Sequence, residues 1–540
     1  MRVALPSRPH AATESAPAVR GDRSTRSRSA RPRAQPVTVT VDPGVPGPVV
    51  PEDFAGLSFE RGALSPGNAG VAGYLFSPAN TSLITLFRNL GLRSLRIGGG
   101  SVDELIPAGT GSDGFTGIDN LFAFADAAGM RVIYTLRLLS PAAEPVKDLQ
   151  PINAHVAGYI WGRYRENVAS FAIGNEPDWH NLHTYAEHPV DPAIYEQASG
   201  VPGSAYPSYL ARWRSLAEAV GAAAPRAPLC GPDTGAYTTL TYTPDPSTGM
   251  SWTERFAADL PCPQITEITQ HHYAGGAPGA TTARQAIDNM LSPEWVSSTN
   301  IGTQPAGTTY IPYPWLYLNN LAAVLAAGLR YRMTEANDYL GGVPGASNAF
   351  ASALWSLDYL HWWAAHGAAG VNFHNRQWLF TGTIIPDPAA PGGYAVTPKG
   401  YGIKAFTLGS AGRVKPTQTA KPDGLNLTAY CIGTAGDDYV TIINKTHGEN
   451  AADAAVTVLP PRPAPHRAQV MTLAGGQRKD AAGTDATLGG AVITGDTGWQ
   501  GTWNALPTAP RAGIRLTVNA ATAAIVRIHG PRACLEPGDG

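Results

Sequence analysis

The sequence has little net charge and few charged residues. Lysine and arginine number 39 against 41 aspartate and glutamate, which gives a formal charge of −2, and 15% of the residues are charged. Such a chain has no overall field to attract nucleic acid or an anionic membrane. No segment reaches the unbroken apolar length that a bilayer span needs. Neither nucleic acid nor a membrane is therefore expected as a partner.

Cysteine is also scarce, and its spacing argues against a structural zinc site. The four residues Cys230, Cys262, Cys431 and Cys534 form no CxxC pair. Buried free thiols are expected for such isolated cysteines. A disulfide between Cys230 and Cys262 is the alternative, and it requires that two neighbouring strands carry them.

Glycine and proline, in contrast, are abundant. The 540 residues include 60 glycines and 47 prolines, and 43% of the chain is apolar. This composition favours a sizeable core with many turns over a helical bundle. The length predicts one large domain and a smaller one.

The first 35 residues form a leader rich in arginine, serine, alanine and proline. It lacks the continuous apolar stretch of a secretory signal, and it has too little apolar surface to offset the entropy of ordering. We expect residues 1–35 to be disordered. A basic interaction arm, a mis-assigned start codon and a degenerate export leader are the alternatives. Secreted and cytoplasmic locations both stay open, and the oligomeric state is not predicted.

Between residues 51 and 398 short apolar strands alternate with amphipathic helical stretches. The expected strands are residues 55–60, 94–100, 131–138, 168–177, 227–235, 265–276, 329–338 and 370–375. Eight strand–helix units predict an α/β fold, a closed (β/α)8 TIM barrel. A doubly wound sheet is the alternative, but "GLSFERGAL" after the first strand lacks the GxGxxG phosphate loop.

The rest of the chain is predicted to form a β-sandwich. Residues 399–540 contain short alternating runs such as "YVTIINKT" and "AAIVRI", separated by turn clusters. The segment 36–50 begins with the alternating "PVTVTVD" and has no place in the barrel. We expect it to add a strand to this C-terminal sandwich domain.

Polar residues at the strand exits are the candidates for chemistry, because parallel strands of a barrel end on one face. They are Glu60, Arg137, Asn175, Glu176, Asp233, His271, His272, Tyr273, Glu335, Asn372 and His374. Glu176 and Glu335 each end a long apolar run, on the fourth and seventh strands, so they face each other across the mouth. Glycosidic bond cleavage needs such a pair, one carboxyl protonated and the other ionised. A separation of about 5–5.5 Å predicts retention of configuration, and a wider one predicts inversion.

The neighbouring polar residues qualify this hypothesis. Asn175, directly before Glu176, offers an amide suited to a sugar 2-hydroxyl. His271 and His272 point to opposite faces of one strand, so both cannot bind one metal ion from the same side. One ring is expected to line the site and the other to pack outside. No metal and no cofactor are expected.

Two segments resemble those of known enzymes. "AIGNEPD" and "RMTEAND" are similar to the acid/base and nucleophile segments of retaining barrel glycosidases. The longer stretch 331–374, beginning "YRMTEANDYLGGVPGASNAF", resembles glycoside hydrolase family 79, the β-glucuronidase and heparanase family. "GLSFE", "LRIGGGSVD", "QHHYAGG" and "TPKGYGIKAF" stand where that family has comparable segments. The resemblance runs from about residue 50 to 410, with the sandwich following where the family has one.

The resemblance implies a retaining, exo-acting β-glucuronidase whose partner is a carbohydrate. It makes Glu176 the general acid/base and Glu335 the nucleophile. The expected substrate ligands are Asn175 for the 2-hydroxyl, Tyr273 beside the nucleophile, Glu60 for hydroxyls on the far side of the ring, and the amides of Gly341 and Gly342 for the glucuronate carboxylate.

One position departs from the family pattern. Some members place a tyrosine directly before the glycine pair, whereas here Leu340 intervenes and Tyr339 lies one residue earlier. Tyr339 is still a candidate for the carboxylate. A retaining enzyme for another glycone, a neutral hexose or 4-O-methylglucuronate, is the nearest alternative. A non-catalytic carbohydrate-binding protein is the second.

Overall fold

The computed structural model describes most of the chain from residue 34 onward. The described ranges are 34–42, 44–67, 73–104, 114–139, 146–179, 206–235, 249–260, 262–304, 307–375, 380–434, 436–461, 467–476, 479–509 and 513–530. The leader 1–33 lies outside them, so the expectation of disorder there is not tested. Ala34–Gly540 form one compact unit.

Eight parallel strands close into a barrel, which confirms the predicted fold. They are β3 (Ala55–Glu60), β4 (Ser94–Gly98), β5 (Arg131–Leu136), β6 (Val168–Ile173), β7 (Leu229–Thr234), β8 (Ile265–Tyr273), β11 (Tyr331–Asn337) and β12 (Gly370–His374). Each pairs with the next in chain order, and β12 closes the ring on β3. All eight correspond to strands expected from the sequence.

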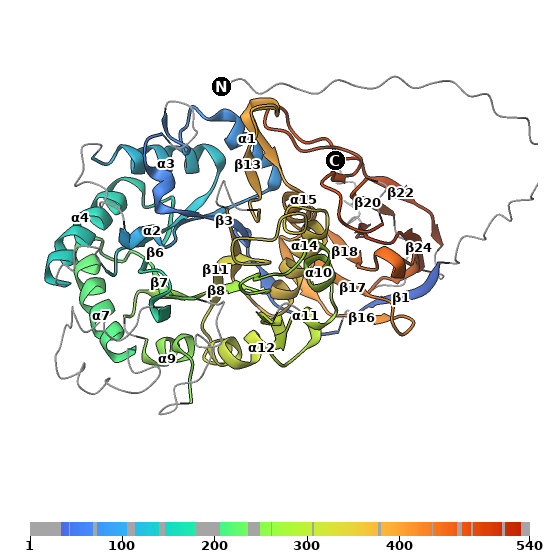
Figure 1. Ribbon diagram of the computed structural model, residues 1–540, viewed down its shortest axis with the longest axis horizontal. Helices are drawn as coiled ribbons and strands as arrows, with labels where there is room; N and C mark the ends of the chain where they lie inside the picture. Colours follow the sequence, from blue (N-terminus) through green and yellow to red (C-terminus); the bar gives the residue numbers. More distant parts are fainter. Residues whose placement is uncertain are drawn as a thin grey trace, which may run out of the picture. The chain divides into compact units, whose positions relative to one another are not determined.

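Helices connect these strands and cover the outside of the barrel (Figure 1). They are α1 (Thr81–Leu90), α2 (Ser101–Glu104), α3 (Thr116–Ala128), α4 (Val146–Tyr164), α7 (Tyr206–Ala223), α9 (Trp252–Asp259), α10 (Ala283–Met290), α11 (Glu294–Ser297), α12 (Tyr313–Leu316), α13 (Ala322–Ala326) and α14 (Ala351–Ala365). Short 3₁₀ turns η1 (Arg61–Leu64) and η3 (Pro177–Trp179), the π-helical turn η4 (Tyr317–Leu321) and the hairpin β9 (Gly302–Thr303) with β10 (Thr309–Tyr310) complete this part.

Several helix starts follow from local sequence. Ser251 and Glu254 form a reciprocal capping box at α9, and Thr282 and Gln285 form another at α10. Such side chains satisfy amide N–H groups that the first helical turn leaves without a partner. Within the described ranges, no helix combines the length and apolarity needed to cross a bilayer.

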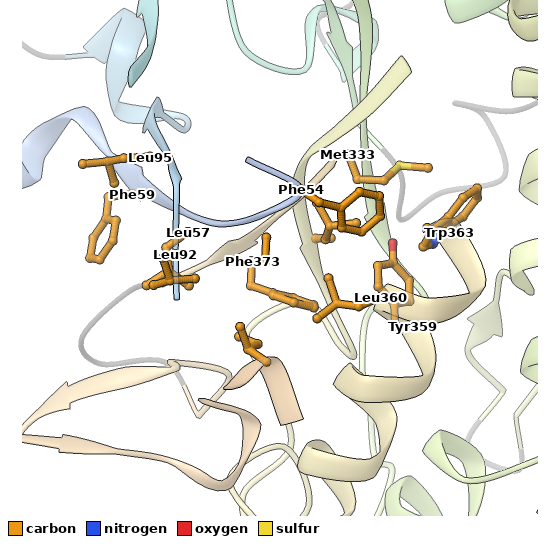
Figure 2. Packing of buried hydrophobic residues seen from close by; sticks show 14 of the residues in the cluster. Phe54, Leu57, Phe59, Leu92, Leu95, Met333, Tyr359, Leu360, Trp363 and Phe373 are labelled. Carbon is orange, nitrogen blue, oxygen red and sulfur yellow. The ribbon is translucent and has the colours of Figure 1, made fainter. Parts of the chain in front are cut away.

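The barrel core lies between the strands and the helices. Figure 2 shows Phe373 of β12 beside Tyr359 and Leu360 of α14; the Phe373 and Tyr359 ring centroids are 5.9 Å apart. Nearly every side chain of α14 is buried, including Trp355 and Trp363. A helix that is buried all round needs cover on both sides, and α14 has the barrel on one side only.

The second cover comes from the C-terminal half. After β12 come the hairpin β13 (Ile384–Pro386) with β14 (Tyr394–Val396) and the short turn η5 (Pro391–Gly393), then helix α15 (Pro398–Thr407), which packs along α14. The predicted boundary between the barrel and the sandwich falls at the first residues of α15.

Two sheets follow. A five-stranded sheet has the order β16 (Thr417–Ala420), β1 (Gln35–Val41), β19 (Ala454–Leu459), β24 (Gly513–Val518) and β23 (Thr508–Ala509). An eight-stranded sheet contains β2 (Val49–Val50), β15 (Gly412–Lys415), β17 (Leu427–Gly433), β18 (Asp437–Asn444), β25 (Thr522–His529), β20 (Ala468–Ala474) and β21 (Thr487–Leu488), with β22 (Asn504–Leu506) on β20. The short turn η6 (Gly448–Asn450) lies between β18 and β19.

The N-terminal strand β1 belongs to the five-stranded sheet. It pairs in parallel with β19 and antiparallel with β16, beside which it lies in Figure 1. Its inward residues, with those of β19, share one apolar cluster with Cys431 and Ile442 of the other sheet. The two sheets therefore pack face to face around a common core.

The middle of the eight-stranded sheet is buried on both faces. Cys431 and Ile442 lie in the core of the sandwich, whereas their chain neighbours Ile432 and Ile443 lie in the core of the barrel. Alternate residues of a strand point to opposite faces, so the same strands serve both cores.

A buried polar contact adds to this connection. Asp358 of α14 pairs with Lys445 at 2.7 Å and accepts hydrogen bonds from Thr428 and Tyr430 of β17. Helix α14 is thus held between the barrel and the sheet by charge as well as by apolar packing.

The cysteines are free where the structure describes them. Cys230, Cys262 and Cys431 form no disulfide. The expectation of buried free thiols is confirmed for Cys230 and Cys431, whereas Cys262 is free but only partly buried; the alternative pairing of Cys230 with Cys262 is wrong. Cys534 lies outside the described residues.

Candidate active site

The two glutamates singled out in the sequence come together at the carboxyl end of the barrel. A carboxylate oxygen of Glu176, one of Glu335 and a ring nitrogen of His271 all lie within 4.8 Å of one another. Both glutamate side chains are mostly buried, with 14% of Glu176 and 8% of Glu335 exposed. Residues 159 positions apart in the chain thus form one carboxylate pair.

Local backbone irregularities aim both side chains. Glu176 follows β6 and has a φ of 48°, which is unusual for a residue other than glycine, and its N–H donates to the carbonyl of Asp233 at 2.9 Å. Glu335 lies where the pairing of β11 shifts register against both of its neighbours, after Met333. A bulge of this kind redirects a side chain, and bulges are frequent beside functional sites.

Both carboxylate oxygens of Glu335 have donors. Arg96 of β4 donates to Oε2 at 2.6 Å, and the hydroxyl of Tyr273 donates to Oε1 at 2.6 Å. Tyr273 therefore lies beside the nucleophile candidate, where the resemblance places it.

Arg96 also joins the other members of the site. Its second terminal nitrogen donates to Asn175 at 2.8 Å and to the carboxylate of Asp233 at 2.9 Å, and its side chain is fully buried. Two carboxylates beside one guanidinium satisfy the charge of a group that could not otherwise be buried. Asn175 is thereby held next to Glu176 by its oxygen.

The charge state of Glu335 follows from these neighbours. Burial alone acts to raise its pKa, but the positive charges of His374, His271 and Arg96 and the Tyr273 hydrogen bond outweigh burial and hold the pKa of Glu335 well below its ordinary value. Burial and the same carboxylate raise the pKa of Tyr273 well above its ordinary value, so the phenol remains a donor. Glu335 is therefore an ionised carboxylate over the ordinary pH range.

Glu176 has a different neighbour. Nδ1 of His271 lies 2.9 Å from Oε1 of Glu176, and Nε2 of the same ring lies 4.0 Å from Asp233. Burial lowers the pKa of His271, but the charge of Glu335 and the hydrogen bond to Glu176 outweigh it, so the pKa is raised. The two members of the carboxylate pair thus differ: one is held by an arginine and a phenol, the other by an imidazole.

The second histidine faces away, as expected. His272 bonds the hydroxyl of Tyr359 at 2.8 Å and the carbonyl of Ile311 at 3.0 Å, among the helices outside the barrel. Burial lowers the pKa of His272 to about 4. The prediction that one ring lines the site and the other packs outside is confirmed.

Glu60 lies at the edge of the same group. Its Oε2 accepts from the amide and the hydroxyl of Ser101, at 2.9 and 2.6 Å, and its Oε1 is 3.6 Å from His374. His374 in turn is 3.5 Å from Glu335. Gly99, with a φ of 74°, makes room for this carboxylate, because a Cβ there would overlap its carboxyl carbon.

Tyr339 is engaged elsewhere. Its side chain is fully buried, and its hydroxyl donates to Gln304 at 3.0 Å and accepts from Asn289 at 3.2 Å. These partners come from the segment between β8 and β11. The expected role of Tyr339 toward a substrate carboxylate stays a prediction, and its hydroxyl contacts provide no support for it.

The glycine pair is only partly available. Gly341 and Gly342 have φ values of 75° and 82°, as a tight turn requires. The amide of Gly342 donates to the carbonyl of Tyr339 at 3.2 Å. The amide of Gly341, in contrast, donates to no residue in the described part of the chain.

A metal ion suits this arrangement poorly. Glu176, His271 and Glu335 are residue types that ligate metals, and they are close enough to share an ion. However, both oxygens of Glu335 already accept hydrogen bonds, and the guanidinium of Arg96 would repel a cation. The donors to Glu335, Arg96 and Tyr273, fit a network of ion pairs and hydrogen bonds better than a metal site.

A cavity of about 1180 Å³ also opens at the other end of the barrel. It is lined by Arg93, Arg131, Ser170, Glu267 and Arg330, among others, near the starts of the strands. This end of a parallel barrel serves stability in known enzymes. The carboxylate pair, rather than this cavity, therefore marks the candidate active site.

Sequence reasoning missed the role of Arg96. It lies inside a quoted segment, "LRIGGGSVD", but received no function. One signal was present: an arginine between Leu95 and Ile97 is a charge in the middle of a buried strand. Asp233, His271 and His374 were identified as strand-exit residues, but not as partners of the two glutamates.

Comparisons with solved structures give the fold. The structure of a 4-O-α-L-rhamnosyl-β-D-glucuronidase from Fusarium oxysporum, in complex with Rha-GlcA, is similar with a TM-score of 0.63 and 16% identity, covering 91% of this chain and 99% of that one. A family 51 arabinofuranosidase from Xanthomonas axonopodis pv. citri gives 0.61 and 13%, covering 92% and 100%. A family 44 xyloglucanase from Paenibacillus polymyxa gives 0.57 and 14%, covering 92% and 100%.

The sequence itself has no comparable match. No protein-family model matches the chain. No curated protein matches it. These three solved structures are those of glycoside hydrolases, and at identities of 13–16% the likeness establishes the barrel with its additional domain.

Proposed function

We propose that this protein is a retaining β-glycosidase that uses Glu335 as the nucleophile and Glu176 as the acid/base. One observation carries the proposal: the doubly hydrogen-bonded carboxylate of Glu335 lies within 4.8 Å of a second carboxylate that has different partners. No two of these ligand atoms are more than 4.8 Å apart, which favours the closely spaced pair of a retaining enzyme over the separation of about 6.5–9.5 Å in inverting enzymes.

In the first step Glu335 attacks the anomeric carbon and a covalent glycosyl-enzyme forms. The departing oxygen receives a proton from Glu176, so the bond to the aglycone breaks without releasing an alkoxide. Arg96 and Tyr273 hold Glu335 through one oxygen each. Glu335 loses its negative charge as it bonds to the anomeric carbon. The hydrogen bonds from Arg96 and Tyr273 keep its carboxylate oriented during this step.

In the second step Glu176 takes a proton from water, and the resulting hydroxide attacks the anomeric carbon. Glu335 leaves as a carboxylate, and its surroundings favour that charge. Two inversions at one carbon give net retention. Asn175, held by Arg96 at 2.8 Å, is positioned to receive the 2-hydroxyl of the sugar beside Glu176.

The preferred glycone in this proposal is β-linked glucuronic acid, removed from a chain end. The resemblance of residues 331–374 to the β-glucuronidase family favours it, and the amide of Gly341 is available to a carboxylate. A solved structure with the same fold is that of a glucuronidase, which is compatible with this choice.

A neutral hexose is the second candidate glycone. It is favoured by Tyr339 and the amide of Gly342, because their hydrogen bonds are made within the protein rather than left for a substrate carboxylate. A 4-O-methylglucuronate carries the same carboxylate as glucuronate, so these contacts do not separate the two. Endo or exo action on a chain is a separate question from the glycone.

The test is a panel of aryl β-glycosides that includes the glucuronide, the 4-O-methylglucuronide and the glucoside. We expect turnover of the glucuronide, with the β-anomer of the product appearing first in proton NMR spectra. A higher kcat/KM for the glucoside would overturn the glucuronide assignment and leave the mechanism intact. Initial release of the α-anomer would overturn the mechanism.

The nucleophile is tested separately. Glu335→Gln is expected to lower kcat by about 10⁴-fold or more, because loss of a nucleophile removes the covalent route. Glu267→Gln is the matched control. Glu267 is a glutamate of β8 at the opposite end of the barrel, where it pairs with Arg330 and Arg332. It should lose stability but keep kcat. Unchanged turnover in Glu335→Gln would rule out Glu335 as the nucleophile. No activity of the wild-type protein on any aryl glycoside would favour a carbohydrate-binding protein.

A further inference from the structure

The second residue of helix α15 is a lysine that has no access to solvent. Lys399 is 0% exposed, and its Nζ donates to Oδ1 of Asn337 at 2.7 Å and to the carbonyl of Thr381 at 2.9 Å. The carboxylate of Asp338 lies 3.7 Å away. The ammonium also lies over the ring of Trp355, 5.3 Å from its centroid.

This arrangement adds little to stability. Burial lowers the pKa of Lys399 despite the attraction of Asp338, so the charged form is disfavoured. A cation in the first turn of a helix also opposes the helix dipole. Well-packed apolar residues often stabilise a protein as much as a buried ion pair does. What the lysine provides is a fixed direction for its partners.

The first partner belongs to the strand that carries Glu335. Asn337 is the last residue of β11, two positions after Glu335, so the two side chains leave the strand on the same side. The amide nitrogen of Asn337 donates to the carbonyl of His374 at 2.9 Å, at the end of β12. The ring of His374 lies 3.5 Å from Glu335. Lys399, Asn337 and His374 therefore connect α15 to two strand ends of the active site.

The backbone ladder cannot supply this connection. The pairing of β11 with β12 shifts register between Met333 and Ala336, and Ala336 with Phe373 is its last pair. Beyond that point the exits of the two strands are joined through the side chain of Asn337. Lys399 binds the oxygen of the same side-chain amide.

The second partner belongs to the loop after β12. Thr381 packs against the glycine pair, since a Cβ on Gly342 would lie 3.0 Å from the nitrogen of Thr381. By holding the carbonyl of Thr381, Lys399 fixes this loop against the turn that follows the nucleophile strand. One ammonium group thus sets both sides of the Glu335 exit.

We propose that Lys399 is a positioning residue that fixes the direction of Glu335 from outside the substrate site, through Asn337 and Thr381. The inference rests on the proposed function for its effect on turnover. It concerns a residue that contacts neither of the two carboxylates of the pair. Its expected signature is a loss of kcat with little change in KM.

The test compares three variants. Lys399→Met removes the ammonium and retains the length of the side chain. Lys399→Met with Asp338→Asn also removes the buried charge left behind, while an asparagine oxygen still accepts from the amide of Tyr339 as Asp338 does at 2.8 Å. Lys404→Met is the matched control. Lys404 lies on the same helix over the ring of Trp499, 4.9 Å from its centroid, and burial lowers its pKa to about 8.

We expect Lys399→Met to lower kcat by about 10- to 100-fold, the effect of a displacement of about 1 Å, with KM changed less than about threefold. The double variant should recover the midpoint of urea unfolding but not kcat. Lys404→Met should keep kcat. Recovery of kcat in the double variant, or an equal kcat loss in Lys404→Met, would overturn the proposal and leave a structural role.

A second readout is independent of activity. Amide hydrogen exchange in the segment 334–339 should accelerate in both Lys399 variants and not in Lys404→Met. If the wild-type protein turns over no aryl glycoside, the proposed function fails, and the exchange data alone decide the role of Lys399. Unchanged exchange in the double variant would overturn the positioning role even if Lys399→Met alone does not fold.

Discussion

Replacing Arg96 by methionine tests the charge arrangement around Glu335. The guanidinium is fully buried, 2.6 Å from Glu335 and 2.9 Å from Asp233, which is 1% exposed. Methionine is close to arginine in length but brings no charge. The variant therefore leaves two buried carboxylates without the arginine that compensates their charge.

The cost to stability can be estimated from the burial of these groups. Removing one partner of a buried ion pair destabilises a protein by about 3–5 kcal/mol, because the remaining charge is uncompensated. Here the exposed fractions of the partners are small enough for that figure to apply without a reduction for solvent screening. Whole domains have stabilities of about 5–15 kcal/mol, so the variant should fold at low temperature with a much lower urea midpoint.

The pH dependence of activity gives the sharper result. The pKa of Glu335 is held below its value in the unfolded chain, so the ionised form contributes stability above that unfolded value, and this contribution is lost as the pH falls through the folded pKa. Without Arg96 one source of the lowering is gone, and the pKa of Glu335 rises. The reaction needs Glu335 ionised, so the acid limb of kcat/KM should move to higher pH.

Arg332→Met is the matched control. Arg332 is a second buried arginine of the barrel, and it pairs with Glu267 at 2.8 Å and Asp53 at 3.1 Å near the opposite end. It should lose a similar amount of stability and keep the acid limb of the wild-type protein. The assay is kcat/KM of an aryl glycoside against pH, with urea unfolding in parallel. An acid limb of Arg96→Met that overlays the wild-type curve, or an equal shift in Arg332→Met, would refute the reasoning.

Three further outcomes follow from the site. Glu176→Ala should lower kcat by about 10²- to 10⁴-fold and recover with azide when the leaving group is good, measured as the rate of aryl release and the appearance of a glycosyl azide; no recovery would argue against an acid/base at this position. Tyr273→Phe removes a hydrogen bond to a charged group, worth about 1.5–3 kcal/mol, so kcat should fall roughly 10- to 100-fold in steady-state assays, and a change under twofold would contradict its contact with Glu335. Gly99→Ala places a Cβ against the carboxylate of Glu60, so kcat/KM should fall, whereas Gly100→Ala meets no atom within 4 Å and should behave as wild type; equal kcat/KM in the two variants would remove Glu60 from the binding site.

The barrel could be predicted because its signals are local. Each strand is a short apolar run followed by a helix, and parallel strands buried on both sides show such runs. Glu176 and Glu335 could be paired because the strands of a closed barrel follow one another around the ring in chain order. The number of a strand therefore gives its place on the ring. The bulge at Glu335 was not predicted, although the sequence carries a signal for it: the apolar–polar alternation of β11 changes phase where Thr334 and Glu335 follow each other, and the register shifts there.

The network around the glutamates could not be predicted from the sequence. Arg96 contacts residues 79, 137 and 239 positions away, and no periodicity links such distant partners. The resemblance implied that the glycine pair and Tyr339 all bind a substrate carboxylate. In the structure the hydroxyl of Tyr339 is hydrogen-bonded to Asn289 and Gln304 from another segment. Competition between partners inside the protein is not visible in a motif.

The sheet that faces two cores has a consequence for how such proteins can be cut and recombined. Strands β17, β18 and β25 pack against the barrel with one face and against the other sheet with the opposite face. Asp358 forms an ion pair with Lys445 at this junction. A fragment that ends at α15 would expose the apolar side chains of α14 to solvent and leave Asp358 without Lys445. A fragment that contains only the sheets would expose the apolar face that packs on the barrel. We therefore expect that neither half can be exchanged between proteins unless the residues at this junction are exchanged with it.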